Sequence, residues 1–184
     1  RAAWGVVKGQ LFRQAAEIFV RLIRGDELAS ADVAPIVLRP DLFRTYADWQ
    51  KARELANGAD PIPVDPFYVF EILKIVPQDF RRELLNLVVG SHDPVVQEEL
   101  NRLHPIQVFN LSITKRDVIE DTHRRMTAAY HPSGGPWHRG YMPRTVFVFL
   151  NEQPGLSKEA RRSAARDEAR AALSSRIDIP PSEP

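Results

Sequence analysis

The chain has 184 residues, of which 43% are hydrophobic and 27% charged, an ordinary balance for a globular domain. Its 25 basic and 24 acidic residues give a net charge of +1, so no basic surface covers the whole molecule and nucleic acid is not the expected partner. The absence of cysteine excludes disulfides, thiolate metal sites and cysteine nucleophiles. No apolar run approaches the roughly 20 residues that span a bilayer.

The first predicted element is a helix from Trp4 to Arg24. Apolar side chains recur every three or four residues along it, and Gly25 ends the pattern. We expect Leu11, Ile18 and Leu22 to be buried. The apolar face is wider than a small bundle needs, so part of it is expected to face a partner.

Capping residues predict a second helix, which begins after Asp41 and ends at Asn57-Gly58. Proline predicts the start of three more, because it is tolerated at the first helical position. These three helices begin at Pro66, Pro77 and Pro94.

The carboxyl-terminal half combines two predicted β elements with two further helices. The β elements are residues 106–113 and 145–150, where β-branched and aromatic residues gather. Thr114 resembles the first residue of a capping box and predicts the helix between them. Ser157 caps a final helix rich in alanine and arginine, and residues 177–184 are an extended tail.

These elements predict a mainly α fold: a multi-helix domain with helices broken at proline and glycine joints, a minor β element and an extended C-terminal arm. Residues 1–58 form an N-terminal helical hairpin or extension, 59–150 a helical domain with the β element, and 151–184 the last helix and tail. The segment from Ser157 onward is expected to be an assembly arm, because its helix offers alanine where a core helix would offer larger side chains.

One metal-site hypothesis involves a Glu-x-x-His step formed by Glu120 and His123, which places both side chains on one helical face. His131 and His138 approach this pair if the following loop folds back. A carboxylate-bridged di-metal bundle needs two such steps, and the chain has one. A metal-dependent enzyme built on these four residues is therefore an alternative, and surface or hydrogen-bonded histidines are the preferred interpretation. We expect no cofactor and, without a catalytic motif, no enzymatic activity.

Basic residues gather in the last predicted helix. Arg161, Arg162 and Arg166 present planar donors that suit carboxylate or phosphate. The simpler interpretation is a solvated helix with charge pairs such as Glu159 and Arg162. We treat the three arginines as candidate partner contacts.

A family resemblance covers residues 93–150. The acidic stretch 98–103 is followed by Pro105, then by a basic helix that opens at Lys115-Arg116, and then by a loop that contains Trp137. This order resembles subunit 7 of the mitochondrial cytochrome bc1 complex, in which an acidic helix, a similar proline step, a basic helix and a Pro-x-x-Trp-like segment follow one another.

The resemblance implies a non-catalytic helical subunit on the matrix side of the mitochondrial inner membrane, packed against cytochrome b. Arg102, Lys115 and Arg116 would then be partner contacts. Trp137 is a further candidate partner contact. A processed amino terminus at Arg1 suits an imported protein.

The sequence therefore predicts an accessory or structural subunit whose partners are other protein subunits. Stiff proline-rich spacers and many large aromatic side chains favour this class. Peripheral contact with a membrane is compatible with it. The alternatives are a phage or bacterial structural assembly protein, an RNA-binding subunit and the metal-dependent enzyme. Outside the resemblance, the expected location is soluble and intracellular.

Overall fold

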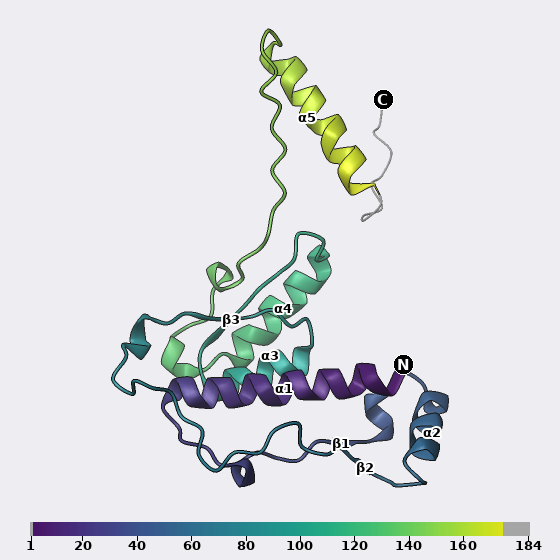
Figure 1. Cartoon of the computed structure of the whole chain (residues 1–184). Helices are drawn as coiled ribbons and strands as arrows, with labels where there is room; N and C mark the ends of the chain where they lie inside the picture. The colour runs from purple at the N-terminus through teal and green to yellow at the C-terminus, as the bar shows by residue number, and fades with distance from the viewer. Residues whose placement is uncertain (1, 175–184) are drawn as a thin grey trace.

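The computed structural model describes residues 2–174, so the predicted tail 177–184 lies outside the described residues. The described chain is mainly α-helical, as predicted, with two small sheets. The α-helices are α1 (Ala2–Arg24), α2 (Tyr46–Leu55), α3 (Pro94–Leu103), α4 (Arg116–Ala129) and α5 (Lys158–Leu173). In Figure 1, α1 lies along the body with α2 near its amino end, α3 and α4 pack together behind it, and α5 stands away from the body.

Helix α1 confirms the first predicted element, but its buried face is rotated from the predicted stripe. Ile18 is buried, whereas Leu11 and Leu22 are only half-buried. Val20, which the predicted stripe left out, joins the main core and packs with side chains of α3. Which residues of α1 are buried depends on the face that packs against α3. The hydrophobic spacing of α1 alone does not show which face that is.

Helix α2 begins later than predicted. Thr45 is its N-cap, with Oγ1 accepting a hydrogen bond from the backbone N of Asp48 at 3.2 Å. Asp41 lies instead in a short 3-10 turn, Pro40–Leu42. The predicted end of α2 is confirmed, since Asn57 and Gly58 follow the helix with φ of 53° and 82°.

The first small sheet joins the segments before and after α2. Strand β1 (Val37–Leu38) pairs antiparallel with β2 (Ile62–Pro63). The two strands lie on opposite sides of residue 58, where the sequence analysis placed a boundary between the first two regions. Their pairing supports a small core of Leu38, Phe43, Trp49, Ala52 and Ile62.

The helices predicted from Pro66 and Pro77 are wrong. Leu73 lies in an extended segment, where it exchanges two backbone hydrogen bonds with Leu28 at 2.7 and 3.0 Å. The stretch from Pro77 contains only a 3-10 turn, Arg82–Leu84, before strand β3 (Leu87–Val89). Extended pairing with a distant segment satisfies backbone groups that a helix would have satisfied locally.

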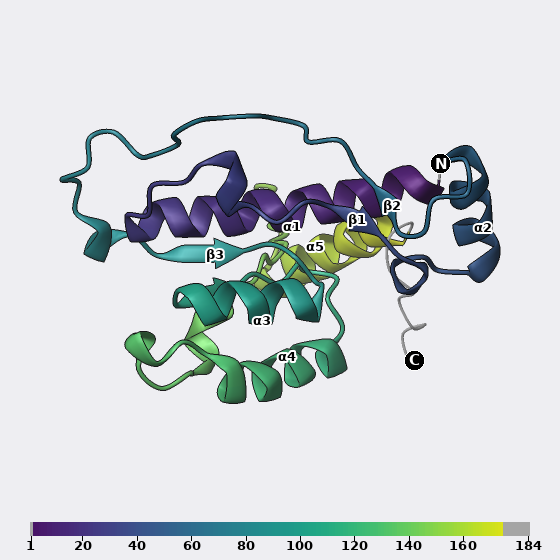
Figure 2. The same ribbon diagram turned by 90° about the horizontal axis from the view of Figure 1, so that it is seen from below.

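Strand β3, helix α3 and strand β4 (Ile106–Val108) form one parallel β-α-β unit. The predicted start of α3 is confirmed, because Asp93 caps it and accepts a hydrogen bond from Val95 N at 2.9 Å. In the view of Figure 2 the ribbon of β3 passes between those of α1 and α3, and these two helices also contact each other directly. The main core gathers here from Val20, Val89, Val96, Leu100, Ile106, Val108, Met126 and Trp137.

The two predicted β elements have different outcomes. The first is confirmed for its residues 106–108, which form β4. The second, 145–150, is not a strand: Arg144 makes one isolated parallel bridge with Asn110, and the chain then leaves the body. Helix α5 follows, capped as predicted by Ser157. We call residues 144–174 the C-terminal arm; its helix has no buried side chain.

Candidate interaction surfaces

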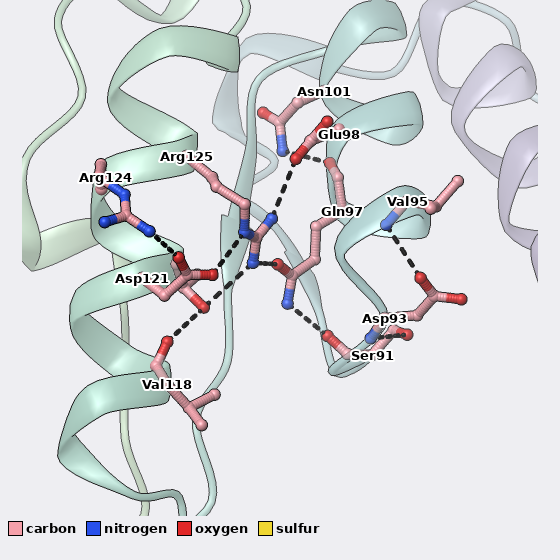
Figure 3. A network of polar contacts seen from close by, with 11 residues as sticks. Ser91, Asp93, Val95, Gln97, Glu98, Asn101, Val118, Asp121, Arg124 and Arg125 are labelled. Atoms are coloured by element: carbon pink, nitrogen blue, oxygen red, sulfur yellow. Dashed lines mark hydrogen bonds and ion pairs between the residues drawn. The ribbon is translucent and has the colours of Figure 1, made fainter.

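The centre of the α3–α4 contact is the guanidinium of Arg125 (Figure 3). From α4 it reaches Gln97 Oε1 at 2.9 Å and Glu98 Oε1 at 3.2 Å on α3, and Asp121 Oδ2 at 3.0 Å on its own helix. The hydrogen bond from Arg125 holds the pKa of Asp121 below its ordinary value. Gln97 is itself buried and donates from Nε2 to the backbone oxygen of Ser91 at 2.8 Å. This network fastens the two helices together.

The sequence analysis did not single out Arg125. Its spacing of four residues from Asp121 is a signal that would have indicated a helical charge pair. The bonds to Gln97 and Glu98 depend on how α3 packs against α4. Gln97, Glu98 and Asp121 each accept a hydrogen bond from this guanidinium, so the network has a structural role.

The two helical residues of the metal-site hypothesis have separate partners. Glu120 pairs with Arg139, which lowers the pKa of the Glu120 carboxyl. His123 Nδ1 accepts a hydrogen bond from Trp137 Nε1 at 2.9 Å. The Glu-x-x-His step therefore binds two different side chains of the following loop.

The two loop histidines of that hypothesis are engaged within their own turns. His131 Nδ1 lies 2.8 Å from Ser133 Oγ, and His138 Nδ1 accepts a hydrogen bond from Gly140 N at 3.0 Å. Across residues 2–174, no group of three or more His, Asp or Glu side chains is arranged to hold a metal ion.

Trp137, predicted as a partner contact, is part of the core of the isolated chain. Only 9% of its surface is exposed. Its ring packs edge-on against Tyr130 at 5.0 Å and Tyr141 at 5.6 Å between ring centroids. The indole N–H is satisfied by His123, so the side chain has both its apolar surface and its donor occupied inside the chain.

The six predicted basic contacts lie on the surface at three places. Arg102 lies near the carboxyl end of α3, Lys115 and Arg116 lie at the amino end of α4, and the other three lie on α5. All six are exposed, and within the described part of the chain none forms an ion pair with an acidic residue. Lys115 occupies the N-cap position of α4 without a side-chain cap, so the capping box predicted from Thr114 is wrong. These cations are available to a partner.

The C-terminal arm exposes apolar surface as well as charge. Its first part leaves Val146, Phe147, Val148 and Leu150 exposed. Helix α5 then turns back along this part, and a hollow of about 410 Å³ lies between them, lined by Phe149, Leu156, Arg161 and Arg162 among others. The arm therefore presents aromatic and guanidinium groups side by side.

A second apolar surface lies on α1. Trp4, Phe12 and Phe19 are about half exposed, and spacings of eight and seven residues put them on one side of the helix. The predicted excess width of the apolar face is therefore exposed surface on the described chain. Exposed apolar patches of this kind are typical of contact sites.

A cavity of about 360 Å³ lies between residues 30–36 and 64–70, beside Gln14 of α1. Tyr68 lines it and donates from its hydroxyl to Gln14 Oε1 at 2.9 Å, while burial raises the pKa of the Tyr68 phenol. The lining is mostly apolar, and Asp65 is the charged residue in it. The cavity can accept an apolar group but offers no acid and base pair for catalysis.

Comparisons with models of protein families, with curated proteins and with solved structures find no significant match to this chain. Within residues 2–174, no helix has both the length and the apolar character needed to cross a membrane.

Proposed function

We propose that the protein is a non-catalytic structural subunit of a larger protein assembly, which it enters through its C-terminal arm. The observation that carries this proposal is that α5 has no buried side chain while the chain leading to it exposes a run of large apolar residues. Ordering such a segment costs conformational entropy, and contacts within the chain return little apolar burial for it. A partner surface would supply the missing burial.

Charge on the arm supports a polar rim around that apolar contact. Arg161, Arg162 and Arg166 are exposed on α5, and the first two line the same hollow as Phe149 and Leu150 on the preceding segment. Interfaces commonly combine buried aromatic side chains with arginine, which makes directional hydrogen bonds at little packing cost. The partners are therefore other protein subunits with apolar surface and carboxylates.

As a specific candidate we propose a subunit 7-like role in a cytochrome bc1 complex, on the matrix side of the mitochondrial inner membrane. Its support is the resemblance of residues 93–150 and the exposure of Arg102, Lys115 and Arg116, the contacts that the resemblance implies. A phage or bacterial structural assembly protein is the other member of this functional class.

Native mass spectrometry of the complex purified from its source tests the proposal. One or two copies of this chain beside several different subunits would support an accessory subunit. Many copies would instead indicate a shell or tail protein, and a chain that remains without other subunits would contradict the proposal.

A further inference from the structure

The first part of the arm is an extended segment that pairs with no strand in the described part of the chain (Figure 1). Pro143 and Pro154 bracket ten residues that all carry a backbone N–H donor. Thr145 N donates to Asn110 O at 3.1 Å, beside the isolated bridge of Arg144. Beyond Thr145, no backbone hydrogen bond within residues 2–174 involves residues 146–150. This stretch leaves its donors and acceptors open along its length.

Both faces of this extended segment are apolar. Val146, Val148 and Leu150 alternate with Phe147 and Phe149, so an extended backbone directs the two sets to opposite faces. The exposed fractions of Val146, Val148 and Leu150 are 68%, 72% and 72%, and that of Phe147 is 47%. Strands with two apolar faces are found covered on both sides. A covering group must therefore also pair with the backbone.

We infer that residues 144–152 pair antiparallel with the same segment of a second copy of this chain, with Val148 opposite Val148. This inference rests on the proposed function, because it names one partner of the arm. In this register Phe147 of one copy faces Phe149 of the other, and Val146 faces Leu150. Such aromatic and aliphatic cross-strand pairs stabilise antiparallel sheets.

Charge selects this register. Arg144 and Glu152 each lie four residues from Val148, so pairing places the arginine of one copy opposite the glutamate of the other, twice. Within residues 2–174 neither forms an ion pair, and Arg144 uses only Nη2, which donates to Ser112 O and Thr114 O at 2.7 and 3.3 Å. A shift by two residues would place Arg144 opposite Leu150 instead.

A lipid surface fits these observations less well, because acyl chains offer no partners for open backbone groups. The edge of a sheet in another subunit would supply those partners. However, Arg144 and Glu152 lie at equal distances from Val148, and this symmetry brings opposite charges together only when the segment pairs with a second copy of itself.

Disulfide trapping tests the register directly, because the chain has no cysteine and each introduced thiol is unique. Directly opposed antiparallel residues lie within the Cα separation of disulfides. We expect full-length Val148→Cys to form a covalent dimer on mild oxidation. Val146→Cys should do so only when mixed with Leu150→Cys. Leu55→Cys, exposed on α2, sets the background rate.

Charge reversal gives a second test by sedimentation of the full chain. Arg144→Glu and Glu152→Arg should each weaken the dimer at least ten-fold, because like charges then face each other. Mixing the two variants should restore dimers, since every facing pair is again opposite in sign. The cysteine assay covers the case in which the loss of the Ser112 and Thr114 contacts disturbs Arg144→Glu.

A chain that sediments as a monomer, or a Val148→Cys variant that crosslinks no faster than Leu55→Cys, would overturn the inference. If that monomer still entered a larger complex, another subunit would cover the segment and the proposed function would stand. If the protein dimerised in this register but joined no other subunit, self-pairing would be supported and the proposed function contradicted.

Discussion

Asn101 holds Ile106 by both ends of its side-chain amide. Oδ1 accepts from Ile106 N at 3.0 Å, and Nδ2 donates to Ile106 O at 3.1 Å. Asn101 is fully buried on α3, and Ile106 begins β4. The amide therefore takes the place of a neighbouring strand's backbone where α3 passes into the sheet.

Replacing Asn101 with alanine should lower the free energy of unfolding by about 2–4 kcal/mol, because two buried backbone groups lose their partners. Urea denaturation followed by circular dichroism measures this. Asn86→Ala, at an exposed position, is the matched control and should change stability by less than about 0.5 kcal/mol. Equal effects of the two variants would show that the Asn101 amide is dispensable.

Adjacent residues of α1 should differ sharply in their contribution to stability. Ile18 is 7% exposed and Phe19 is 53% exposed. Ile18→Ala should cost about 2–4 kcal/mol of unfolding free energy through lost burial and a cavity. Phe19→Ala should cost about 0.5 kcal/mol or less in the isolated chain. A larger loss for Phe19→Ala than for Ile18→Ala would contradict this assignment of the buried face of α1.

Gly134 lies where a side chain has no room. A Cβ at this position would meet Tyr130 Cε1 at 2.5 Å and Pro105 Cβ at 2.7 Å. Gly134→Ala should therefore destabilise the protein by about 1–3 kcal/mol through overpacking. A lower thermal midpoint and an altered near-ultraviolet aromatic signal would report this. Gly90→Ala, with no atom within 4 Å of the added methyl group, is the control, and a similar loss there would contradict the steric explanation.

His104 should make stability depend on pH. Burial lowers its pKa from the ordinary value, and charges on His131 and Arg24 lower it further. Below about pH 6.5 the unfolded chain then binds this proton more readily than the folded chain, so the free energy of unfolding falls as pH decreases. His104→Gln should show a smaller fall between about pH 7.5 and 5.5. Parallel curves of unfolding free energy against pH for the two proteins would contradict this prediction. Carboxyl groups with lowered pKa values do not contribute in this window, because they take up protons only at more acidic pH.

Local signals predicted the fold where nothing distant competed with them. Asp93-Pro94 and Asp65-Pro66 are the same helix-start signal, yet only the first begins a helix. The chain after Pro66 is instead held extended, with Phe70 N donating to Ser30 Oγ at 2.7 Å. That partner lies 40 residues away, so no local pattern could reveal it.

The candidate contact residues also differ in how far the sequence could predict their exposure. The alanine and arginine content of α5 predicted an exposed helix, because a helix without large apolar residues gains little by packing. Trp137 carried no such information: a large aromatic residue suits a core or an interface equally. In the isolated chain Tyr130 and Tyr141 pack around its ring, and this packing depends on how the loop after α4 folds back.

The measurement that tests the central claim most directly compares the full chain with one that lacks residues 157–184, for both thermal stability and incorporation into the native complex. Because α5 has no buried side chain, the thermal midpoint of the isolated truncated protein should stay within a few degrees of the full chain. Its incorporation should be strongly reduced. A truncated chain that fails to fold alone, yet still joins the complex when co-produced with it, would show that this segment belongs to the core and is not a docking arm.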